Sequence, residues 1–189
     1  NDGILDSKEE ALASKYAPNL NFAAGEQFFP TRVRYHLDNS DLIQKSMSGD
    51  TIIKHHPTEL EISLYSSESY YLNNTLGGLD EIANNFTQVK ETLGYTVYVR
   101  VTKTLENFIV QYWFFYAFNP GTINQHQGDW EMIEIILNLS EEPLYAVYSQ
   151  HFSGERASWN DVEKLDGTHP IVYAGLGSHA NYFRPYQGK

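Results

Sequence analysis

The segment FIVQYWFFYAF, residues 108–118, decides the fold. Apolar side chains occupy both sets of alternating positions, so a β-strand here would be covered on both faces and lie in the centre of a sheet. The segment is too short to cross a bilayer as a helix, which takes about 20 residues. We therefore expect a buried strand of a soluble sheet rather than a membrane span.

Four more strand patterns follow the same logic in the second half of the chain. Apolar residues alternate or cluster, and turn-forming residues such as Pro143 and the Asp166–Gly167 pair separate the segments. The predicted strands are 96–101, 129–137, 143–151 and 170–175. We expect the last three to form the central sheet with 108–118. The fold class predicted is mainly β, an antiparallel β-sandwich with a few short peripheral helices.

The first half of the chain carries the helix patterns. Capping-box spacing between Ser7 and Glu10 predicts a helix over 7–16, and Gly49 as a stop predicts a short helix over 39–48. Three- to four-residue apolar spacing predicts a helix over 79–94. Alternation of Leu60, Ile62 and Leu64 predicts a strand over 59–66. We expect a single domain over 1–189, in which a helix-containing half, 1–94, packs on a sheet-rich core, 95–183.

Composition excludes several function classes. The net charge of −11 argues against nucleic acid as a partner, because phosphate binding needs clustered Lys and Arg. The same charge disfavours an anionic bilayer, although a bridging cation would still permit peripheral contact with an anionic head group. The chain has no cysteine, which excludes disulfides and thiolate metal sites and leaves the compartment open.

The stretch NQHQGDWEMIEIIL, residues 124–137, carries the strongest chemical signal. On a strand, Asp129 and Glu131 share a face, and His126 lies in a Gly- and Gln-rich loop that can fold back toward them. Two carboxylates so close repel unless a cation neutralises them. Mg²⁺, Ca²⁺ or Mn²⁺ would suit these oxygen ligands, and Zn²⁺ would tolerate the imidazole. The alternative is that the two carboxylates are solvated at the start of a strand and His126 is a loop residue.

Two more histidines end predicted strands. His151 ends the strand at 143–151, and His179 lies just after the strand at 170–175. Ends of neighbouring strands cluster in space, so both could join one rim and act as catalytic acid or base. The alternative for each is a buried or turn histidine. A nucleophilic serine is disfavoured, because the chain has no G-x-S-x-G elbow.

Several stretches together resemble the vacuolar protein sorting-associated protein 62 family. They run in the same order along almost the whole chain: YAPNLNFAAGEQFFP (16–30), VQYWFFYAFNPG (110–121), HQGDWEMIEI (126–135), YSQHFSGE (148–155) and HPIVYAGLGSHANYF (169–183). The activity of that family is poorly defined, so this resemblance implies more about fold than about function.

A more distant similarity is to the necrosis- and ethylene-inducing peptide-like proteins, which are secreted β-sandwich cytolysins. Their heptapeptide GHRHDWE corresponds to QHQGDWE at 125–131, so that His126, Asp129 and Glu131 match and Gly128 does not. The resemblance implies a divalent cation at the matching residues that engages the sugars of sphingolipid head groups. A further acidic ligand of those proteins corresponds here to Asn119, whose carbonyl could still ligate. The same resemblance favours a secreted or cell-surface location.

Three functions therefore remain as expectations. The first is a divalent-cation-dependent binding module for a glycan or lipid head group. The second is a metal-assisted hydrolase in which His151 or His179 moves the proton. The third is a scaffold domain without metal, in which Asp129 and Glu131 accept hydrogen bonds from His126 and loop amides.

Overall fold

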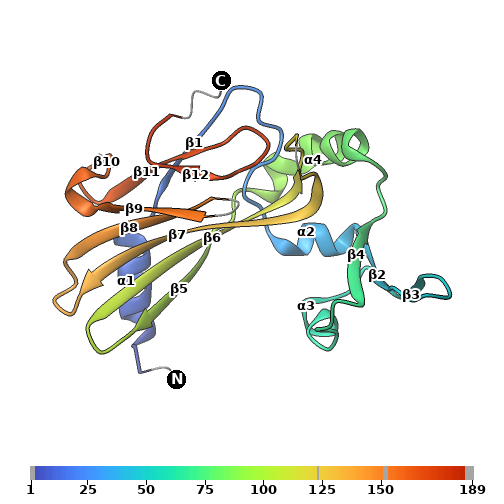
Figure 1. Ribbon diagram of the computed structural model, residues 1–189, viewed down its shortest axis with the longest axis horizontal. Coiled ribbons are helices and arrows are strands. Elements are labelled where there is room, and N and C mark those ends of the chain that lie inside the picture. The colour runs from blue at the N-terminus through green and yellow to red at the C-terminus, as the bar shows by residue number, and fades with distance from the viewer. Residues whose placement is uncertain (1–2, 123, 151–152, 186–189) are drawn as a thin grey trace. The chain divides into compact units, whose positions relative to one another are not determined.

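The computed structural model describes residues 3–122, 124–150 and 153–185 (Figure 1). The chain forms two compact units. Unit 1 comprises Asn1–Glu26, Val97–Phe114 and Trp130–Lys189, and unit 2 comprises Gln27–Thr96 and Phe115–Asp129. Each unit therefore combines segments from both halves of the sequence. The arrangement of a single domain in which residues 1–94 pack on residues 95–183 stays a prediction.

Unit 1 contains most of a five-stranded sheet with the order β5-β6-β7-β8-β9. The pairs β5–β6, β7–β8 and β8–β9 are antiparallel. The strands are β5 (Tyr98–Lys103), β6 (Asn107–Asn119), β7 (His126–Asn138), β8 (Pro143–Gln150) and β9 (Ser153–Ser158). The central position of β6 and β7 confirms the expectation from the apolar pattern.

A second sheet of unit 1 is built around β11 (His169–Ala174). It pairs in parallel with β1 (Asn19–Phe22) and antiparallel with β10 (Lys164–Leu165) and β12 (Asn181–Tyr182). The expectation that 170–175 joins the same sheet as 108–118 was therefore wrong. The partner of this segment is β1, close to the N-terminus, and a local pattern does not contain such a long-range pairing.

The core of unit 1 joins the two sheets and α1 (Asp6–Lys15). Tyr112 and Tyr148 are buried from the five-stranded sheet. The Tyr112 hydroxyl donates to the Ala13 carbonyl of α1 at 2.9 Å, and the Tyr148 hydroxyl donates to the Ile171 carbonyl of β11 at 3.1 Å. Figure 1 shows the smaller sheet lying over the larger one. This arrangement confirms a mainly β sandwich with a few short helices; η1 (Trp159–Asp161) is a single turn after β9.

Unit 2 combines helices with a three-stranded sheet of order β3-β2-β4. Its elements are α2 (Val33–Asp38), β2 (Ser40–Gln44), β3 (Thr51–His55), α3 (Glu59–Ile62), β4 (Tyr70–Asn74) and α4 (Leu79–Leu93). Aromatic rings form its core. Phe28 lies 5.6 Å from Phe86 of α4 and 6.0 Å from Phe118 of β6, measured between ring centroids. This core holds the last residues of β6, where the candidate site lies.

Two predictions for the first half were wrong in their element type. Residues 39–48 contain the strand β2, because its backbone pairs with both β3 and β4. Residues 59–66 begin with the short helix α3. The Thr58 hydroxyl accepts from the Glu61 N–H and the Glu61 carboxylate accepts from the Thr58 N–H, a capping box that starts a helix. The alternating leucines are exposed, so they form no strand face.

Candidate functional site

The candidate site in unit 2 lies where β6 ends and β7 begins. Asn119 is the last residue of β6 and His126 the first of β7. The pairing that closes these two strands brings together three polar side chains, namely Asn119, His126 and Asp129. Asn119 and Asp129 are buried and His126 is partly exposed, so the imidazole forms the solvent side of the cluster.

The hydrogen bonds of His126 fix where its protons lie. Nδ1 lies 2.8 Å from the carbonyl oxygen of Asn124, and a carbonyl only accepts, so Nδ1 carries a hydrogen. Nε2 then faces Oδ1 of Asp129 at 3.2 Å. In a neutral imidazole with this tautomer, two lone pairs would face each other. If the Asp129 carboxyl is ionised, a shared proton or a bound cation would join the two atoms.

Asn119 completes the cluster from the side of β6. Its amide nitrogen donates to Oδ2 of Asp129 at 3.2 Å, and its amide oxygen accepts from the Gly121 N–H at 2.8 Å. In this orientation Asn119 holds Asp129 in place with an N–H group. To act as the predicted oxygen ligand, the amide would have to turn over and give up its bond to Gly121.

A packed wall of unit 2 lies behind this cluster. Gly128 has a φ of 68°, and a Cβ built on it would lie 3.5 Å from both His36 Nε2 and the Phe115 ring. The rings of His36 and Phe115 meet edge to face with centroids 5.7 Å apart. Burial lowers the pKa of His36 to about 4, so this imidazole is neutral at physiological pH. Sequence reasoning missed His36, because a histidine inside a helix pattern carries no signal of its own.

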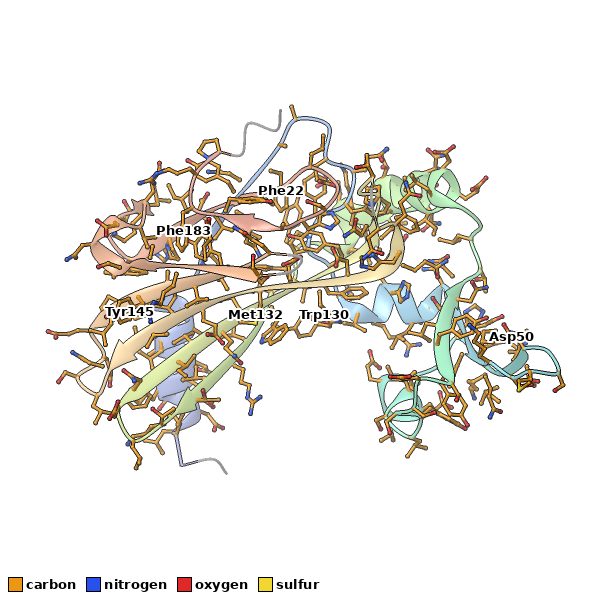
Figure 2. All side chains as sticks on the ribbon, in the orientation of Figure 1. Phe22, Asp50, Trp130, Met132, Tyr145 and Phe183 are labelled. Carbon is orange, nitrogen blue, oxygen red and sulfur yellow. The ribbon has the colours of Figure 1, made fainter. Side chains whose placement is uncertain are left out.

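Glu131 lies two residues beyond Asp129 on β7, in unit 1, and its side chain is also buried. Its carboxylate accepts a hydrogen bond from the Ser149 hydroxyl, which in turn accepts from the Met132 N–H at 3.0 Å. Its assignment as a metal ligand remains a prediction. On the opposite face of β7, Trp130 is 45% exposed and lies on the same side as Met132 (Figure 2).

The two histidines predicted at strand ends differ in what the structure describes. His151 lies outside the described residues. His179 has a fully buried side chain, with Nε2 3.4 Å from Oε1 of Glu26, which is also buried. The other oxygen of Glu26 accepts from the Gly177 N–H at 2.8 Å. Sequence reasoning missed Glu26, whose only signal is a single acid within the aromatic stretch 16–30. A catalytic role for either histidine remains a prediction.

A second His–Asp pair lies elsewhere in unit 2. Nδ1 of His55 on β3 is 2.8 Å from Oδ1 of Asp41 on β2. One N–H of a neutral imidazole satisfies this contact, so this pair needs no additional positive charge. Within the described ranges, no group of three His, Asp or Glu side chains converges as a metal site. The assignment of His126 and Asp129 as cation ligands therefore remains a prediction.

Comparison with solved structures defines the class of fold. A structure of NLPPya in complex with glucosamine has a TM-score of 0.53 at 17% identity, covering 96% of this chain and 69% of that one. A structure of NLPPya in complex with mannosamine has a TM-score of 0.51 at 17% identity and covers 96% of this chain and 69% of that one. The necrosis and ethylene inducing protein 2 from the causal agent of cocoa's witches' broom disease has a TM-score of 0.51 at 15% identity. That match covers 94% of this chain and 69% of the other. The fold is therefore the β-sandwich of the necrosis- and ethylene-inducing proteins.

The family follows from the sequence itself. Residues 6–188 match the family described as Vacuolar protein sorting-associated protein 62, and the chain belongs to that family. Both resemblances noted in the sequence are confirmed. No curated protein matches the chain. Among the helices in the described ranges, none is both long and apolar enough to span a membrane.

Proposed function

We propose that this protein is a sugar-binding module, and that a divalent cation held by His126 and Asp129 takes part in binding. The sugar is either free or carried on a lipid head group. Two observations support the proposal. Proteins with the same fold have been captured with amino sugars, and an imidazole nitrogen and a carboxylate oxygen face each other at the start of β7.

The observation that carries the cation is the contact between His126 and Asp129. With the hydrogen of a neutral ring on Nδ1 and the carboxyl ionised, Nε2 of His126 and Oδ1 of Asp129 are both acceptors, and both are common ligands of divalent ions. Asn119 holds the other carboxylate oxygen of Asp129 through an N–H, which orients Asp129 toward His126. A bound Mg²⁺, Ca²⁺ or Mn²⁺ would supply positive charge that attracts sugar hydroxyl oxygens.

The packing behind the pair supports a preorganised site. At Gly128 the backbone passes close to the side chains of His36 and Phe115. The side-chain oxygen of Gln127 accepts a hydrogen bond from the Asn74 N–H at 2.6 Å. These contacts lock the first residues of β7, so His126 and Asp129 lose little conformational freedom when a ligand binds. Glu131 stays the predicted additional ligand further along the strand.

The test is calorimetric titration of the protein with glucosamine and mannosamine. We expect binding heat in the presence of Mg²⁺, Ca²⁺ or Mn²⁺, and its loss with a chelator or in Asp129→Asn. The matched control is Asp41→Asn, which breaks the other His–Asp pair and should leave binding unchanged. Heat that is insensitive to both the chelator and Asp129→Asn would contradict the cation. Absence of binding to any sugar would contradict the module itself.

A second arm separates the two sources of sugar. Vesicles that contain a glycosylated sphingolipid are compared with vesicles of the same lipid without the sugar, in sedimentation with cation present. Binding to the glycosylated vesicles but not to the soluble sugars would assign the ligand to a lipid head group. Equal sedimentation with both kinds of vesicle would argue against sugar recognition.

A further inference from the structure

Unit 1 contains a cleft that the proposed cation site does not use. It has a volume of about 610 Å³ and lies at the ends of β1, β11 and β12 and along the loop that follows β11. Small-molecule sites in proteins are concave, mostly apolar and about 300–1,000 Å³ in size. The cleft therefore has the size of a ligand site.

One side of the cleft is a row of residues across three strands. Tyr173 of β11 is in register with Asn21 of β1 on one side and with Tyr182 of β12 on the other. All three residues line the cleft, and Phe22, labelled in Figure 2, adds a third aromatic ring. Aromatic faces offer an apolar surface and phenol groups offer a polar edge, which suits a ligand that is itself apolar on one face and hydroxylated at its rim.

The charge of the cleft restricts the ligand further. None of the described lining residues is Asp, Glu, Lys, Arg or His, and the polar groups are an amide, phenols and the Ser178 hydroxyl. The Tyr173 hydroxyl donates to Oε2 of Glu163 at 3.1 Å. Partial burial and the Glu163 carboxylate raise the pKa of Tyr173, so the phenol stays neutral. The lining itself therefore supplies no counter-charge to an ionic ligand.

The loop that forms the opposite wall is held rigidly. Gly177 donates to the buried Glu26 carboxylate, and the same carboxylate lies 3.4 Å from the buried His179 ring. His179 has a φ of 56°, a left-handed conformation that residues other than glycine rarely adopt. A Cβ on Gly175 would lie 2.8 Å from the Ser178 hydroxyl, so the turn closes tightly. The bond from Gly177 to Glu26 and the tight turn at Gly175 thus hold the wall of the cleft.

We propose that this cleft is a second binding site, which takes the ring of a neutral sugar without a cation. The apolar face of the ring stacks on Tyr173, Tyr182 or Phe22, and its hydroxyls bond to Asn21 and Ser178. Glu26 and His179 are positioning residues that hold the loop 175–179 in place. The site lies wholly in unit 1, and its lining residues include none of the proposed cation ligands.

The test uses neutral disaccharides in the presence of a chelator, so that the proposed cation site is silent. Cellobiose, maltose and chitobiose are screened by saturation-transfer NMR, and the Kd of any binder is measured by calorimetry. Ala23→Trp places a large side chain on an exposed residue of the cleft and should weaken binding by about tenfold or more, which is about 1.4 kcal/mol. Leu139→Trp is the matched control on an exposed turn and should bind like the parent.

The outcomes separate this site from the proposed cation site. Asp129→Asn should leave disaccharide binding unchanged, whereas Leu176→Ser, which removes an exposed apolar wall residue, should weaken it. The inference is overturned if none of the three disaccharides binds, if Ala23→Trp and Leu176→Ser both bind like the parent, or if binding requires a divalent cation. Loss of the cation-dependent heat in Asp129→Asn bears only on the proposed function.

Discussion

Protonation of His36 should destabilise the folded protein in mild acid. Its side chain is 3% exposed and lies against Phe115 and Gly128, directly behind the candidate site. Burial lowers its pKa from 6.5 to about 4. As the pH falls, the unfolded chain therefore binds a proton on this imidazole that the folded protein excludes. The free energy of unfolding begins to decrease near pH 6.5, the pKa of the imidazole in the unfolded chain.

The magnitude follows from the two pKa values. The stability is fully present above the unfolded value of 6.5 and falls as the pH drops toward about 4, the folded value. A shift of one pKa unit corresponds to about 1.4 kcal/mol, so the full effect is about 3 kcal/mol. Between about pH 7 and about pH 5, the linkage relation gives a loss of about 2 kcal/mol from this single group.

The assay is urea unfolding at the two pH values for the parent, His36→Leu and His56→Asn. The parent should lose about 2 kcal/mol more than His36→Leu, because leucine has no proton to bind. His56 is exposed with a φ of 48°, which asparagine adopts readily, so His56→Asn controls for removal of a surface histidine. An equal pH dependence in parent and His36→Leu would refute the assignment of His36 as a buried neutral imidazole.

Two further predictions concern packing in unit 1. Tyr112→Asp should prevent folding, because Tyr112 is buried and an unpaired buried charge costs several kcal/mol; a soluble variant with the melting temperature of the parent would show that the core is misplaced. Gly175→Ala should cost about 1–3 kcal/mol in urea unfolding, because the new methyl would lie 2.8 Å from the Ser178 hydroxyl. The double variant Gly175→Ala/Ser178→Ala should recover most of that loss, and no recovery would mean that the strain lies elsewhere.

The sequence predicts the elements whose stability depends on local pattern. β6 and β7 follow from their apolar residues, and α4 from its three- to four-residue spacing. The parallel pairing of β1 with β11 joins residues far apart in the chain, and no local pattern contains it. At α3 the alternation of leucines competed with the capping box of Thr58 and Glu61, and the capping box prevailed because no partner strand covers the leucines among the described residues.

The candidate site shows the same division. Spacing places His126 near Asp129, and the structure confirms that contact, although His126 lies on β7 itself and not in the predicted loop. The orientation of Asn119 depends on the N–H of Gly121, and the position of Glu26 beside His179 depends on a contact between distant segments. Neither follows from residue types alone, which is why the sequence suggested ligands but not the groups that position them.

The most direct measurement is the effect of substoichiometric Mn²⁺ on the imidazole NMR signals of the seven histidines. His126 and His55 each face an aspartate, and His126 is the histidine of the proposed cation site. The account predicts that the His126 signals broaden first and that Asp129→Asn abolishes this, while Asp41→Asn does not. Broadening that favours His55, or that leaves His126 unaffected, would contradict the cation site.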